Sequence, residues 1–250
     1  MMQPDYLKCE NGRRLAYHYT GGLEPGVVFL GGFKSDMNGS KAVHLENWAK
    51  SQGRAFLRLD YSGHGQSSGE FTDGCIGDWA ADAKAVINAV CKGRQVVVGS
   101  SMGGWIALLL AREMPQIFAG FVGIAAAPDF TEDSMWAGFS DLQKQQLEQA
   151  GQVVLPSDYD EPYIITDKLI KDGRNQLVLT ADLSLPFAVR LLQGTDDTSV
   201  TRDVALRLLD HAKSADICLT FVKGANHSFS SRECLEQIEK TVAELLDKTG

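Results

Sequence analysis

The stretch 99–103 constrains the fold of this chain more than any other. It reads Gly-Ser-Ser-Met-Gly and directly follows the apolar run 96–98, which is typical of a buried strand. A Gly-x-Ser-x-Gly pentapeptide between a strand and a helix forms a sharp turn that exposes the serine hydroxyl, and its small residues let the turn close. The apolar stretch 105–111 favours a buried helix that ends near Pro115. The context predicts a strand–turn–helix unit with Ser101 as a nucleophile, rather than a glycine-rich turn that merely contains serine.

Composition limits the class of protein and its partners. The chain has 250 residues, of which 44% are hydrophobic, and this is enough for one large core. Its net charge is −8 and its basic residues are scattered, which argues against nucleic acid or an anionic membrane as a partner. No apolar run approaches the roughly 20 residues that span a bilayer, and the N-terminus lacks the pattern of a secretory signal. The oligomeric state is left open.

The cysteines favour a reducing compartment. Their number is odd and no pair has the Cys-x-x-Cys spacing of a metal or redox site. We therefore expect free thiols, a cytoplasmic location, no metal and no other cofactor. A catalytic cysteine is a weaker alternative, because no turn motif surrounds any of them. The five are Cys9, Cys75, Cys91, Cys218 and Cys234.

Apolar strands alternate with amphipathic helices along most of the chain. Expected strands cover 14–19, 27–30, 55–59, 95–98, 118–125, 187–192 and 216–222, and expected helices cover 42–50, 78–90, 105–111, 204–212 and 235–246. Continuous apolar strands that alternate with helices form a parallel sheet covered on both faces. The first of these strands is expected to pair antiparallel. The pattern predicts an α/β protein with a mostly parallel, twisted sheet.

Residues 129–184 interrupt this alternation, because they contain no clear buried strand. They combine a polar helix over 141–150 with the aromatic residues Phe130, Trp136, Phe139, Tyr159 and Tyr163. A long insertion near the carboxyl ends of parallel strands, where ligands bind, is typical of a lid. We expect a core from 1–128 and 185–250 and a small helical lid over 129–184, inserted after the sixth strand. A solvated surface excursion is the simpler alternative.

A serine nucleophile needs a base and an acid. The base takes the hydroxyl proton, and a carboxylate orients the base. His227 is the expected base, since it follows the last strand on a loop of small residues just before the final helix. The other histidines lie in an early strand, in helices or in an early glycine-rich loop. The loop after strand 187–192 offers two adjacent acids, Asp196 and Asp197.

The tetrahedral intermediate of such a reaction carries an oxyanion, which backbone N–H groups stabilise. Met102, the residue after the nucleophile, is the expected first donor. The second donor is expected just past strand 27–30, within residues 31–34.

We call residues 193–200 the acid loop and residues 223–228 the histidine loop. Together with the pentapeptide, these loops resemble those of the α/β-hydrolase superfamily. The resemblance implies the chain order serine, acid, histidine. Many hydrolases of this type carry Gly-x-x-Asp-x-x-Val in the acid loop, and this pattern selects Asp197, in register with Gly194 and Val200. Where the family usually has His-Gly-x, residues 31–33 read Gly-Gly-Phe, so Phe33 takes the donor place. The missing histidine leaves the backbone donor in place.

One further loop matches the superfamily. Residues 60–67 fit its Asp-x-x-Gly-x-Gly-x-Ser pattern. We interpret this loop as structural, with glycines for a tight turn beneath the serine. A phosphate-binding loop is a weaker alternative, because no Lys-Ser/Thr pair follows.

The stretches 32–42, 58–63 and 98–105 are similar to a family of palmitoyl-protein thioesterases that also cleave acyl-glucuronides. This resemblance implies that Ser101, Asp197 and His227 hydrolyse esters or thioesters, with a small-molecule or acyl-protein ester as substrate. The enzyme that carries this resemblance is mitochondrial. Because no transit peptide is evident, the chain resembles a bacterial relative.

Aromatic residues near the serine are candidates for an acyl pocket. Trp105, Trp136 and Phe139 are predicted to line it, although plain core packing explains Trp105 equally well. A non-catalytic binding protein on the same fold is the main alternative to an enzyme, and a peptidase or lactonase is the main alternative to an esterase.

Overall fold

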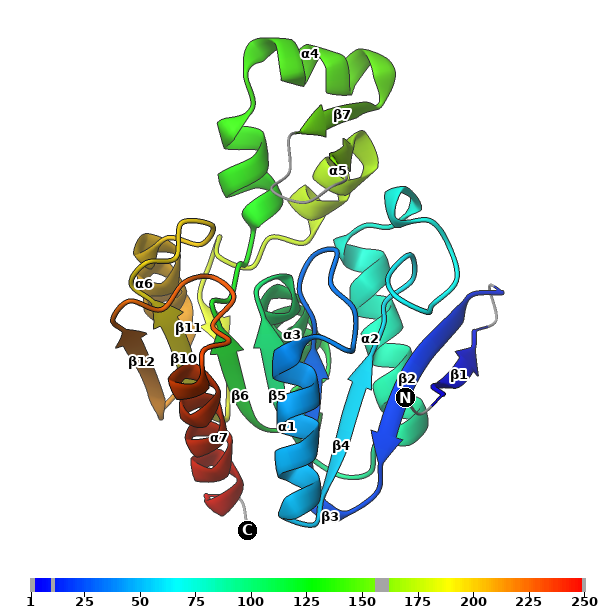
Figure 1. The fold of residues 1–250 in the computed structure, drawn as a ribbon. Coiled ribbons are helices and arrows are strands. Elements are labelled where there is room, and N and C mark those ends of the chain that lie inside the picture. The colour runs from blue at the N-terminus through cyan, green and yellow to red at the C-terminus, as the bar shows by residue number, and fades with distance from the viewer. Residues whose placement is uncertain (1–2, 10–11, 156–161, 249–250) are drawn as a thin grey trace.

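The computed structural model describes residues 3–9, 12–155 and 162–248. Its sheet strands are β1 (Asp5–Lys8), β2 (Arg14–Thr20), β3 (Leu23–Leu30), β4 (Arg54–Leu59), β5 (Gln95–Ser100), β6 (Phe118–Ile124), β10 (Ala188–Gly194) and β12 (Ile217–Val222). They form one twisted sheet in the order β1-β2-β4-β3-β5-β6-β10-β12 (Figure 1). From β4 to β12 the neighbours run parallel, whereas β1 and β2 are antiparallel at one edge. The predicted fold class is confirmed.

Helices cover both faces of this sheet. Helices α1 (Ser40–Ser51) and α7 (Arg232–Asp247) pack on one face, and α2 (Ile76–Val90), α3 (Met102–Glu113) and α6 (Arg202–His211) pack on the other. Side chains of β5 alternate between the two cores, since Val96 and Val98 join the first and Val97 joins the second. All three are 0% exposed. This is why the strand reads as a continuous apolar run.

Most of the described part of the segment between β6 and β10, residues 129–184, lies above the carboxyl ends of the parallel strands (Figure 1). We call it the inserted segment. It contains η3 (Thr131–Trp136), α4 (Asp141–Ala150), β7 (Gln152–Leu155), β8 (Tyr163–Thr166), α5 (Asp167–Asn175) and β9 (Leu183–Ser184). The helix expected over 141–150 is present. Tyr159 lies outside the described residues.

The inserted segment also contains strands that the sequence pattern did not reveal. β7 and β8 pair antiparallel, with Val153 opposite Ile165, and both of these side chains are buried. β9 pairs with β11 (Ala212–Lys213) beside the core. Two short helical turns, η1 (Phe71–Asp73) and η2 (Pro115–Ile117), complete the described elements.

Within the described ranges, none of the helices has both the length and the apolar character needed to cross a membrane.

Candidate active site

Ser101 lies at the turn between β5 and α3. Its backbone φ of 54° and ψ of −119° fall where non-glycine residues are rare. Such strain costs on the order of 1–3 kcal/mol and persists only where the surroundings fix it. Here the backbone at the end of β6 fixes the conformation of Ser101. The N–H of Ser101 donates to the carbonyl of Ile124 at 2.9 Å, and its carbonyl accepts the N–H of Ala127 at 3.1 Å.

The glycines on either side of Ser101 are required by the close approach of neighbouring chain. A Cβ on Gly99 would lie 2.5 Å from the carbonyl oxygen of Gly103. A Cβ on Gly103 would lie 2.1 Å from the carbonyl oxygen of Leu30, at the end of β3. Helix α3 can therefore begin this close to β3 and β5 only with glycine at these positions, which explains the pentapeptide physically.

His227 and Asp197 form a hydrogen-bonded pair beyond the carboxyl ends of β12 and β10. Nδ1 of His227 lies 2.9 Å from Oδ2 of Asp197. The carboxylate is fully buried, whereas the imidazole is 33% exposed. The other oxygen of Asp197 accepts the N–H groups of Ser199 and Val200 at 2.9 and 2.8 Å. With Nδ1–H donated to Asp197, Nε2 of His227 holds the lone pair that can accept a proton.

The charge of Asp197 is maintained by these contacts. Burial by itself would raise the pKa of Asp197, but the hydrogen bonds from His227 and from the backbone of the acid loop lower it below the usual value of an aspartate. Asp196 is exposed, and its carboxylate accepts the hydroxyl of Thr195 at 3.0 Å. The structure brings Asp197, and not Asp196, to His227.

The acid loop and the histidine loop are fastened to each other. Thr195 donates its N–H to the carbonyl of Val222 at 3.0 Å. A Cβ on Gly194 would lie 2.1 Å from the carbonyl oxygen of Ala225, so the two loops are in direct backbone contact. These contacts hold the loop of Asp197 against the loop of His227, so the two side chains stay at a fixed distance.

Ser101 and His227 line one cavity of about 520 Å³. Its wall also includes residues 31–42 in part, Ser199 and Tyr163. Tyr163 belongs to β8, so the inserted segment contributes to the wall. Among the described residues, no group of three His, Cys, Asp or Glu side chains is placed to hold a metal ion.

Phe33 and Met102 lie where donors for an oxyanion are expected. Phe33 lines the cavity, and Met102 begins α3 directly after Ser101. An N–H in the first turn of a helix has no partner within that helix. Of the hydrogen bonds among described residues, none uses the N–H of Phe33 or of Met102. Both N–H groups can therefore donate to a substrate oxygen.

Buried charges hold the loop 31–42 in place. Oδ1 of Asp60 accepts the N–H of Met37 at 2.6 Å, and the guanidinium of Arg58 donates to the carbonyl of Met37 at 2.9 Å. Arg58 also pairs with Glu46 at 2.9 Å. The ion pair and the backbone contacts are buried together, so they anchor the loop at Met37.

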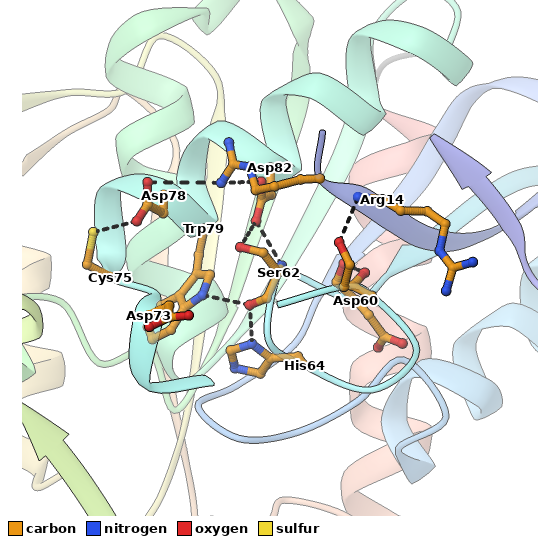
Figure 2. A network of polar contacts seen from close by, with 12 residues as sticks. Arg14, Asp60, Ser62, His64, Asp73, Cys75, Asp78, Trp79 and Asp82 are labelled. Atoms are coloured by element: carbon orange, nitrogen blue, oxygen red, sulfur yellow. Dashed lines mark hydrogen bonds and ion pairs between the residues drawn. The ribbon is translucent and has the colours of Figure 1, made fainter. Parts of the chain in front are cut away.

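The loop 60–67 has contacts that fit the structural role expected for it (Figure 2). The carbonyl of Ser62 accepts the indole N–H of Trp79 at 3.0 Å and lies 3.2 Å from Nδ1 of His64. The hydroxyl of Ser62 donates to Asp82 on α2 at 2.6 Å. These bonds tie the loop to α2.

The three aromatic residues predicted for an acyl pocket are not among the residues that line this cavity. Trp105 is 0% exposed, and its indole N–H donates to the carbonyl of Gln176 at 3.0 Å. The guanidinium of Arg174 lies 4.5 Å from the centre of the Trp136 ring, and the Phe139 ring lies 6.3 Å from that ring. Trp105 therefore packs in the core, which was the alternative to a place in the acyl pocket. Its hydrogen bond to Gln176 fastens α3 to the inserted segment.

Sequence reasoning did not single out Lys41 in the cavity wall. It lies in the first turn of α1, and its ammonium donates to the carbonyl of Ser228, next to His227. Burial lowers the pKa of Lys41. The bond joins the loop 31–42 to the histidine loop. A lysine in a first helical turn carries no signal of such a contact in the sequence.

Comparison with known proteins establishes the family. A family model described as serine aminopeptidase, S33 (Hydrolase_4) matches residues 25–182, more than half of the chain. This chain belongs to the α/β-hydrolase family. The superfamily resemblance found in the sequence motifs is confirmed, and the protein is a hydrolase.

Relatives of known name match over nearly the whole hydrolase. The rat protein named palmitoyl-protein thioesterase ABHD10, mitochondrial is 33% identical over 245 residues, which cover 97% of this hydrolase and 82% of the rat protein. A putative hydrolase from Agrobacterium vitis S4 is 33% identical in its crystal structure, with a TM-score of 0.94 and 98% of both chains covered. The mouse α/β hydrolase domain-containing protein 10 is 30% identical, with a TM-score of 0.92 and 100% of both chains covered. The closer resemblance to the thioesterase family is therefore confirmed too.

Proposed function

We propose that this hydrolase cleaves carboxylic esters and thioesters through an acyl-enzyme on Ser101. The observation that carries the proposal is that His227, paired with Asp197 at 2.9 Å, opens on the same cavity as Ser101. The chain order serine, acid, histidine is that of the family. A non-catalytic binding protein would not need this pair beside a strained serine.

The geometry supports a two-step mechanism. Nε2 of His227 takes the proton of Ser101 as the serine oxygen attacks the substrate carbonyl. The N–H groups of Phe33 and Met102 donate to the resulting oxyanion. His227 then gives the proton to the departing alcohol or thiol. It next deprotonates a water molecule, which attacks the acyl-enzyme, and it returns that proton to the oxygen of Ser101 as the acid is released. Asp197 stabilises the imidazolium in both steps.

The names of the relatives favour an acyl ester or thioester as the substrate class. A match of 33% identity across 97% of this chain to a palmitoyl-protein thioesterase supports a small-molecule or acyl-protein ester. We propose that the inserted segment acts as a lid, because its Tyr163 forms part of the cavity wall. The mechanism uses protein groups alone and calls for no cofactor. All five cysteines are free thiols, which is in keeping with a reducing, cytoplasmic compartment.

Turnover of p-nitrophenyl butyrate by wild type and Ser101→Ala tests the nucleophile. We expect the variant to lose at least about 10³-fold in kcat. A fluorophosphonate probe should label Ser101 in wild type and leave Ser101→Ala unlabelled. Ser51→Ala, an exposed serine at the end of α1, is the matched control and should behave as wild type. Equal hydrolysis by wild type and Ser101→Ala would remove the enzyme proposal.

A substrate panel tests the reaction class. It compares oxygen esters, thioesters and acyl-glucuronides of increasing acyl length with aminoacyl p-nitroanilides, which report peptidase activity. We expect kcat/KM for the esters and thioesters to exceed that for the anilides by at least about 100-fold, because resonance makes an anilide carbonyl less electrophilic and the anilide nitrogen must be protonated before it leaves. A preference for the anilides would favour a peptidase, in line with the description of the family model.

A further inference from the structure

The two ends of the inserted segment meet at one buried carboxylate. Asp129 stands at the start of the segment and is 0% exposed. Its Oδ1 accepts the N–H of Val178 at 2.9 Å, and its Oδ2 accepts the N–H of Leu179 at 2.9 Å. These amides lie near the other end of the segment, 49 and 50 residues further along the chain. A single side chain thus closes the base of the whole insertion.

Only a carboxylate suits this position. Two adjacent N–H groups need two acceptor oxygens, and an asparagine would turn an NH₂ donor toward one of them. Asp129 also has a φ of 59°, a left-handed conformation that asparagine and aspartate tolerate better than other non-glycine residues. Arg207 of α6 lies 3.9 Å from its Oδ2 and donates to the carbonyl of Leu179 at 3.3 Å. Arg207 also pairs with Asp133 at the surface.

The next residue, Phe130, links the base of the segment to the loop 31–42. The ring of Phe130 lies 5.7 Å from the ring of Phe33 and 5.5 Å from that of Trp105. Tyr163, across the inserted segment, lies 6.2 Å from the same Phe33 ring. The side chain of the proposed oxyanion donor is therefore held by aromatic rings from the inserted segment.

Other contacts keep the segment attached without Asp129. On α5, Asp172 accepts the N–H of Gly77 in the first turn of α2 at 2.7 Å. Lys168 pairs with Asp78 of α2 at 2.7 Å. Loss of the Asp129 bonds should therefore loosen the base of the segment and leave its docking on α2 intact.

We propose that Asp129 is a positioning residue, whose two backbone hydrogen bonds close the base of the inserted segment and so set Phe130 against Phe33 beside the Ser101 cavity. The proposal rests on the proposed function, because it gives Phe33 the role of oxyanion donor. Asp129 lies outside the cavity, yet the proposal predicts that its loss slows the chemical step. Removing the bonds lets Phe130 shift and displaces the Phe33 N–H from the oxyanion.

Steady-state kinetics of Asp129→Asn and Asp129→Ala test this effect. Loss of a complete oxyanion donor lowers kcat by about 10²–10³. For a displaced donor we expect kcat for p-nitrophenyl butyrate to fall about tenfold in Asp129→Asn and further in Asp129→Ala, with KM within about threefold. Asp133→Asn is the matched control, because it removes the same charge from the same Arg207 partner at the exposed surface, and its kcat should stay within about twofold. A kcat of folded Asp129→Asn within twofold of wild type overturns the proposal.

Amide hydrogen exchange gives a second readout that does not depend on activity. In wild type the amides of Val178 and Leu179 should be protected, and in Asp129→Asn they should exchange at least about tenfold faster while β5 and α3 keep their protection. Unprotected amides in wild type overturn the proposal even if the variants do not fold. Failure of Ser101 to react with a fluorophosphonate would instead refute the proposed function, so the two failures are distinct.

Discussion

At the scale of single residues, the loop after β10 places two adjacent aspartates in opposite surroundings. Asp197 is buried against His227 and Asp196 is exposed. Asp197→Asn can present an NH₂ donor to Nδ1, which favours the tautomer with its proton on Nε2 and leaves no base for Ser101. We expect kcat for p-nitrophenyl butyrate to fall by about 10⁴ in Asp197→Asn and to stay within about threefold in Asp196→Asn.

The paired variants also serve as each other's control. They differ by one position and remove the same charge, so general effects of net charge cancel. Circular dichroism should show the wild-type fold in both. A large loss confined to Asp196→Asn would transfer the acid role to that residue.

The sequence indicated which polar side chains the structure brings together, but it did not indicate which residues line the cavity. Ser101, Asp197 and His227 each follow an apolar strand, and the ends of parallel strands gather at one edge of a sheet, so chain order alone brings them close. The wall depends on contacts between distant segments. Trp105 follows the serine in the chain, but its helix turns it into the core, whereas Tyr163 reaches the cavity from β8.

At the scale of secondary-structure elements, the start of α3 allows a test of the serine turn. Gly103→Ala would place a Cβ 2.1 Å from the carbonyl oxygen of Leu30, and backbone on both sides cannot easily move away. We expect α3 to shift from β3, with a loss of about 3 kcal/mol in the free energy of unfolding. Activity should fall further than stability alone explains, because Met102 moves with the helix. Urea unfolding and kcat measure the two effects.

Gly138→Ala is the control for this substitution. A Cβ at Gly138, between η3 and α4, meets nothing within 4 Å. Its stability should stay within about 0.5 kcal/mol of wild type. Wild-type activity in a folded Gly103→Ala would show that the turn tolerates a side chain and would contradict this account of the pentapeptide.

Elements with strong periodic patterns were predictable, and short half-buried ones were not. The helix expected over 141–150 has those bounds in the structure. The strands β7 and β8 have four residues each, and their apolar faces are set by packing against each other and the aromatic residues of the inserted segment. Four residues give too few periods to separate a strand from a loop in the sequence.

At the scale of the whole molecule, the cavity lies where five separate parts of the chain meet. The loop 31–42, the serine turn, the acid and histidine loops and the inserted segment all contribute to it. Each is fastened to a neighbour by hydrogen bonds or close backbone contacts, and Asp60 of the loop 60–67 holds the first of them at Met37. Buried polar residues of the loop 60–67 therefore contribute to the stability of the molecule. One of them is His64, whose pKa is well below the ordinary value of a histidine.

His64 is 4% exposed among the rings of Tyr61, Phe71 and Trp79, and its Nε2 has no hydrogen-bond partner among the described residues. Burial, aided by the charge of Lys34, lowers the pKa of His64 from 6.5 to about 4. Between these two values the unfolded chain binds a proton that the folded protein does not, so acidification favours unfolding. This contribution should remove about 2 kcal/mol of stability between about pH 7 and about pH 4.5.

Replacing His64 by phenylalanine keeps the ring contacts and removes the titration. Urea unfolding of wild type and His64→Phe at about pH 7 and about pH 4.5 should show a smaller loss of stability in the variant, by about 2 kcal/mol. The buried Asp60 and Asp82 titrate in both proteins, so the difference between the two losses isolates the histidine. Parallel losses would mean that folding does not lower the pKa of His64, so that the folded protein takes up this proton by about pH 4.5 and then holds a buried charge in the loop 60–67.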